Sequence, residues 1–136
     1  MKTNIKNLAT ILATTIWADG EYDEAEKISV EEIAEAFELD VNELLAAVNA
    51  EVEAISALDE EKVNEVLLQN AAEVDEEEAE LVLQAVLQIA TVDGVLCEEE
   101  VDNILSIASA LGVDEARAVL MLADLVKEEP ELDVVF

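Results

Sequence analysis

Residues 17–26 read WADGEYDEAE, and residues 91–100 read TVDGVLCEEE. Each stretch follows a run of residues without charge and places an Asp-Gly pair ahead of an acidic segment. Asp19 and Asp93 lie 74 positions apart (93 − 19), and the sequences around them align at this offset without a gap. Because chance rarely keeps such a register, we interpret the chain as two related halves, with repeats at about 5–48 and 79–124.

The uncharged runs ahead of the two Asp-Gly pairs span residues 8–18 and 81–92. Lys2 and Lys6 before the first run imitate a signal peptide. The second run has the same character in mid-chain, where a signal peptide has no place, so we expect both to be buried helices. Both are also shorter than the roughly 20 apolar residues that a membrane span requires, which argues against direct membrane insertion.

Apolar residues recur at intervals of three and four positions, as in Ile5, Leu8, Leu12 and Ile16, and no stretch alternates with a period of two. This periodicity predicts an all-α fold without strands. Helices are expected near 3–17, 24–38, 41–55, 60–73, 76–91, 98–111 and 115–128, which makes about seven. We expect one domain over residues 1–136, with two pseudo-two-fold-related repeats packed around the two central apolar helices.

Helix ends are marked by residues with local structural preferences. Three pairs have the spacing of a capping box, which closes a helix N-terminus: Asp23 with Glu26, Asp40 with Glu43, and Asp75 with Glu78. Gly112 and Pro130 supply stop signals, and the apolar tail that follows Pro130 is expected to fold back on the domain.

The balance of charge limits the partners of the chain. Of 136 residues, 35 are Asp or Glu and 6 are Lys or Arg, which gives a formal net charge of −29. Such a surface repels nucleic acid and anionic lipid over a Debye length of about 8 Å, and it favours cations and basic partners. We therefore expect no nucleic-acid binding.

The residue types needed for most catalytic sites are scarce. The chain has no His and one Cys, so it cannot form an internal disulfide, lacks the usual zinc ligands and has no base to activate Cys97. The aromatic content of 3% also disfavours a sugar-cleaving site built on paired carboxylates. These features indicate a protein without enzymatic activity, in a reducing compartment such as the cytoplasm.

Each Asp-Gly stretch matches only part of a calcium-binding EF-hand loop. With the Gly at loop position 6, Asp19 or Asp93 occupies position 5 and Glu26 or Glu100 occupies position 12. The carboxylates expected at positions 1 and 3 are absent in both copies, and those positions fall inside the uncharged helices. The pattern therefore excludes an EF-hand and leaves half a site in each copy.

On these residues, WADGEYDEAE repeated as TVDGVLCEEE after an uncharged helix, the chain resembles the tellurite-resistance TerB family and its TerB-like relatives. The resemblance implies a compact domain of about seven helices and a role in tellurite resistance or stress response. It also implies an acidic cluster that binds divalent metal, formed here by Asp19, Glu26, Asp93 and Glu100, and a protein partner that can be membrane-associated. Cys97 replaces Asp23 in the second copy, so the match between copies is incomplete.

Two hypotheses of function follow. In the first, the four carboxylates bind Ca²⁺, Mg²⁺ or Mn²⁺, because oxygen-only ligands select hard cations and because converging carboxylates repel one another without a cation. In the second, the chain is an acidic protein-interaction scaffold without a specific metal site, and Glu26 only closes a helix terminus. Under either hypothesis Trp17 is expected to be a core side chain, and Gly20 and Gly94 to serve the turns.

Overall fold

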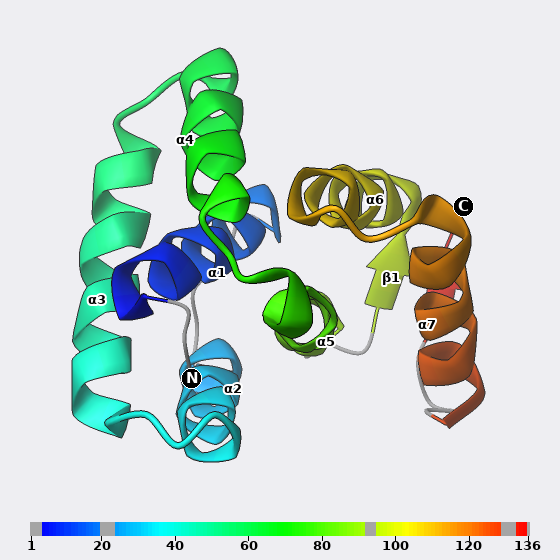
Figure 1. Ribbon diagram of the computed structural model, residues 1–136, viewed down its shortest axis with the longest axis horizontal. Coiled ribbons are helices and arrows are strands. Elements are labelled where there is room, and N and C mark those ends of the chain that lie inside the picture. Colours follow the sequence, from blue (N-terminus) through cyan, green and yellow to red (C-terminus); the bar gives the residue numbers. More distant parts are fainter. Residues whose placement is uncertain (1–3, 20–23, 92–94, 129–132, 136) are drawn as a thin grey trace.

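The computed structural model describes residues 4–19, 24–91, 95–128 and 133–135 (Figure 1). This part of the chain contains seven α-helices and one short 3₁₀ helix, η1. In chain order they are α1 (Ile5–Asp19), α2 (Glu24–Ala36), α3 (Val41–Ser56), α4 (Glu60–Ala72), η1 (Glu76–Glu78), α5 (Ala79–Ala90), α6 (Glu98–Leu111) and α7 (Glu115–Glu128). The all-α fold class and the number of helices are confirmed, and each expected boundary lies within about three residues of the observed one.

Aspartates cap the N-termini of several helices. The carboxylate of Asp40 accepts a hydrogen bond from the backbone N–H of Glu43 at 2.9 Å, as the capping-box spacing predicts. Asp59 accepts from Lys62 N–H at 2.9 Å and caps α4, although no acidic residue follows at the capping-box position. Asp75 accepts from Glu77 N–H rather than from Glu78, because the chain enters α5 through the tighter 3₁₀ turn η1. The predicted cap at Asp23 lies outside the described residues.

The helices α2 and α6 end in the same backbone motif, at positions that correspond in the two halves. At the end of α6, Val113 N–H donates to the Ala108 carbonyl at 2.9 Å across Gly112, whose φ is +82°. At the end of α2, Leu39 N–H donates to the Ala34 carbonyl at 2.8 Å across Glu38, whose φ is +58°. Both are Schellman terminations, which need a residue in the left-handed region. The second half places a glycine there, and the first half places a glutamate.

The two helices that contain the uncharged runs, α1 and α5, contact each other within the core. Figure 1 shows α3 at one edge of the view and α7 at the other, with α1, α5 and α6 between them. The main cluster of buried apolar residues includes members from all seven helices, for example Leu8 on α1, Leu83 on α5 and Ile107 on α6. Each fully buried Leu or Ile contributes about 1.5–3 kcal/mol relative to an exposed one. The apolar stripes predicted from the sequence therefore hold the helices together.

The buried threonines of helix α1 form their hydrogen bonds within the helix itself. The hydroxyls of Thr10, Thr14 and Thr15 donate to the carbonyls four residues earlier, at 2.9, 2.8 and 3.1 Å. Because these bonds need no outside partner, α1 can be surrounded by apolar side chains despite its threonines. Among the described residues, no helix combines the length and the apolar character needed to cross a bilayer.

The prediction that the chain has no strand is wrong. Strand β1 (Val95–Cys97) pairs in parallel with β2 (Asp133–Val135), with Leu96 opposite Val134. Three residues are too short for an alternating pattern to stand out in the sequence, and the hydrogen-bonded partner is needed to define each strand. The pairing confirms that the apolar tail folds back on the domain, where it lies beside the segment that leads into α6.

Candidate functional site

Glu26 lies in the first turn of α2 and is the charged residue that the described part of the fold buries, with 1% of its surface exposed. Its Oε2 atom is shielded from solvent. Removing a carboxylate from water costs several kcal/mol unless donors or a cation compensate for the lost hydration. The helix dipole stabilises a carboxylate near the N-terminus by about 0.3–1 kcal/mol, and by up to about 2 kcal/mol in partly buried sites. The helix dipole alone therefore covers only part of the cost.

Glu100 occupies the corresponding place in the second half. It is the third residue of α6, as Glu26 is the third residue of α2, and its Oε2 atom is also shielded from solvent. The residue as a whole is half-buried. The sequence repeat thus places one buried carboxylate oxygen in the first turn of each of two helices.

The other two predicted ligands lie next to these turns in sequence. Asp19 is the last residue of α1, and its side chain is outside the described part of the structure. Asp93 and both Asp-Gly glycines, Gly20 and Gly94, are likewise outside it. Among the described residues alone, no group of three or more His, Cys, Asp or Glu side chains is placed to hold a metal ion. The four-residue cluster stays a prediction.

Trp17 precedes the first Asp-Gly turn and belongs to the core, as expected. Its partly buried side chain packs against a small cluster of Ala13, Ile55 and Val63, which joins α1 to α3 and α4. This packing fixes the C-terminal end of α1 and hence the backbone position of Asp19. It also places an intrinsic fluorophore two residues from a predicted ligand.

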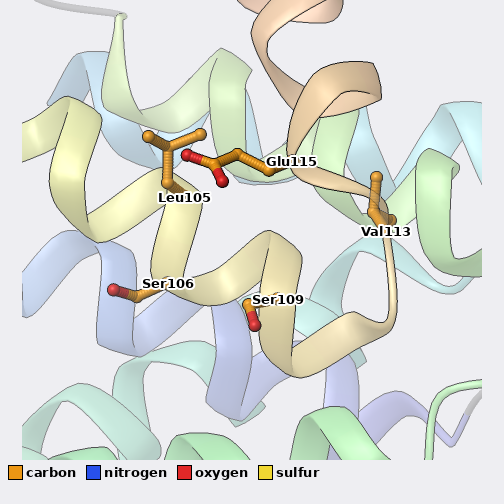
Figure 2. A pocket seen from close by; sticks show the side chains of 5 residues that line it. All are labelled: Leu105, Ser106, Ser109, Val113 and Glu115. Carbon is orange, nitrogen blue, oxygen red and sulfur yellow. The ribbon is translucent and has the colours of Figure 1, made fainter.

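A second candidate site, which the sequence analysis did not identify, lies between α6 and α7. It is a cavity of about 310 Å³ lined by Leu105, Ser106, Ser109, Val113 and Glu115. Figure 2 shows the Glu115 side chain reaching from the start of α7 toward Leu105, with both serines on α6 and Val113 in the connection. The repeat held a signal for it, because the positions that correspond to Ser106 and Ser109 are Glu32 and Glu35 in the first half.

Comparison with protein families identifies the chain. The family model described as tellurite resistance protein TerB matches residues 6–123, which include nearly all of both predicted repeats. The chain therefore belongs to the TerB family, as the duplicated Asp-Gly motif and the helical fold indicated. Comparison with curated proteins and with solved structures finds no match.

Proposed function

We propose that this TerB-family chain is a non-enzymatic acidic helical module that binds a divalent cation through Asp19, Glu26, Asp93 and Glu100. The burial of Glu26 carries the proposal, because a carboxylate with 1% of its surface exposed needs positive charge or several donors nearby. The equivalent position of Glu100, with a buried carboxylate oxygen of its own, supports a site that draws on both halves.

The chemistry of the donors limits the ion. All four predicted ligands are carboxylates, and the chain contains no His to attract zinc or copper. Calcium, magnesium and manganese all accept oxygen-only ligands, and calcium takes six to eight of them. Water or backbone carbonyls would supply the remainder. When bound, such an ion would supply positive charge to a surface whose formal net charge is −29.

Thermal and urea unfolding with added cation test this function. A cation that binds only the folded state stabilises it by RT ln(1 + [L]/Kd), so Ca²⁺ at a hundred times Kd adds about 2.7 kcal/mol. Sodium chloride at matched ionic strength corrects for screening of the acidic surface. Because Trp17 packs near the end of α1, its fluorescence gives a second readout of the same titration.

The decisive comparison uses two double variants with the same change in charge. Asp19→Asn with Asp93→Asn removes two predicted ligands, whereas Glu53→Gln with Glu65→Gln changes exposed residues on α3 and α4. The ligand variant is expected to lose the stabilisation by Ca²⁺, Mg²⁺ and Mn²⁺, and the surface variant to keep it. If both respond as the wild type does beyond the salt control, the chain is an acidic interaction scaffold without a specific metal site.

The proposal includes a cellular setting drawn from the family. Membership in the TerB family supports a role in tellurite resistance or stress response, together with a protein partner that can be membrane-associated. The presence of one cysteine in 136 residues supports a reducing, cytoplasmic location.

A further inference from the structure

We propose that the groove between α6 and α7 binds a lysine or arginine side chain presented by a partner protein. The groove is the cavity lined by Leu105, Ser106, Ser109, Val113 and Glu115. The proposal does not depend on the cation site, because none of these residues belongs to the Asp-Gly motifs.

The lining of the groove suits a Lys or Arg side chain, which carries a cationic group at the end of a chain of methylene groups. Val113 is buried and Leu105 is half-buried, so together they offer an apolar wall to a chain of methylene groups. The hydroxyls of Ser106 and Ser109 accept hydrogen bonds, and the carboxylate of Glu115 offers a charge-assisted one. A volume of about 310 Å³ leaves room for one long side chain and water.

The two halves differ in side-chain size at positions that line the groove. The positions equivalent to Ser106 and Ser109 on α6 are Glu32 and Glu35 on α2, both exposed. Serine is a poorer helix former than glutamate, so the second half gives up some helix stability at these positions. As a result, the face of α6 beside Glu115 carries side chains that are uncharged and smaller than those of α2 at the equivalent positions.

The charges around the groove favour a cation. Arg117, two residues after Glu115, forms an ion pair with Glu80 on α5, and that hydrogen bond and charge raise the pKa of Arg117 above its ordinary value. Within the described part of the chain, Glu115 forms no ion pair. With a net charge of −29 over the chain, the groove attracts basic groups and repels phosphate.

Apolar residues on the exposed part of α7 indicate a protein partner rather than a free amine. Val119 lies one helical turn from Glu115 and is 48% exposed, and the neighbouring Leu120 is 57% exposed. Val119 continues the surface of the groove beyond Glu115 on the same face of α7, and Leu120 extends the exposed apolar surface to the adjoining face, where another protein can contact it. A basic segment that also carries apolar residues would cover them.

Chemical-shift mapping of the ¹⁵N-labelled protein locates the site. The probe is Nα-acetyl-lysine methylamide, compared with the same compound acetylated at Nε, which keeps the stem and loses the charge. The charged probe is expected to shift the amides of residues 105–115 saturably, and the neutral one to leave them unchanged. Shifts spread over the acidic helices, with no saturable set at the groove, would overturn the proposal.

Two double variants separate docking from general attraction. Ser106→Glu with Ser109→Glu adds two charges and fills the groove, whereas Ala46→Glu with Ala50→Glu adds two charges at exposed positions of α3. Docking predicts weaker probe binding in the first and unchanged or tighter binding in the second. General attraction predicts that both bind at least as tightly as the wild type. Glu115→Gln is expected to weaken binding about two- to fivefold, the range for an exposed ion pair.

Discussion

Replacing Glu38 with glycine is expected to stabilise the domain, because Glu38 holds a φ of +58° at the end of α2. The left-handed conformation costs an L-residue about 1–2 kcal/mol, and glycine avoids this cost at the expense of about 0.5–1 kcal/mol of extra backbone entropy. The substitution also removes a carboxylate from the negative end of the helix, which increases the stability of the domain by a few tenths of a kcal/mol. The net gain is about 1 kcal/mol, which raises Tm by about 3–4 °C in a domain of this size.

Urea unfolding of three variants isolates the backbone term. Glu38→Gln removes the charge and keeps the Cβ atom, so it is expected to gain only a few tenths of a kcal/mol. Gly112→Ala is the reciprocal change at the equivalent position, where an added Cβ meets nothing within 4 Å and only the φ of +82° opposes it. It is expected to lose about 1 kcal/mol. Equal midpoints for Glu38→Gly and Glu38→Gln would refute the backbone argument.

Three further changes test the packing and the helix ends. Leu83→Ala removes a fully buried side chain and is expected to lower the free energy of unfolding by about 3–4 kcal/mol. Leu81→Ala, at an exposed position of the same helix, is expected to lower it by under about 0.5 kcal/mol. Urea unfolding of both variants measures the difference. Asp59→Ala removes the N-cap of α4 and is expected to lower the free energy of unfolding by about 1 kcal/mol in the same assay. Asp59→Asn keeps a capping side chain and is expected to retain most of that stability. Deletion of residues 131–136 removes the partner of β1 and is expected to lower Tm; an unchanged Tm would show that the pairing adds no stability.

The helices could be predicted because their signals are local and repeated. A stripe of apolar residues recurs over three or four turns, and a cap such as Asp40 stands next to the helix that it starts. Features that depend on a distant partner could not be predicted. The three-residue strand β1 exists only because residues 133–135 lie beside it, and nothing in the residue type of Glu38 marks a left-handed conformation. Its alignment with Gly112 was the available indication.

The same distinction between local signals and distant contacts applies to the two candidate sites. Periodicity treats glutamate as a surface residue, so it could not predict the burial of Glu26; the match with Glu100 marked the position but not its surroundings. The groove depends on how α7 crosses α6 after the turn at Gly112, and no local pattern encodes that geometry. The replacement of two glutamates by Ser106 and Ser109 could have marked the place, but not its shape.

The short β1–β2 ladder has a consequence for how the molecule opens. By joining residues 95–97 to 133–135, it closes the intervening chain into a loop that contains α6 and α7. Native-state hydrogen exchange commonly reveals such segments as cooperative units that open together at less than the global free energy. Because both ends of this loop are tied, the ladder opposes movement of α7 away from the domain at its C-terminal side. The groove lies inside this loop, so a molecule that draws the tail away from β1 would also loosen the surface on which α6 and α7 meet.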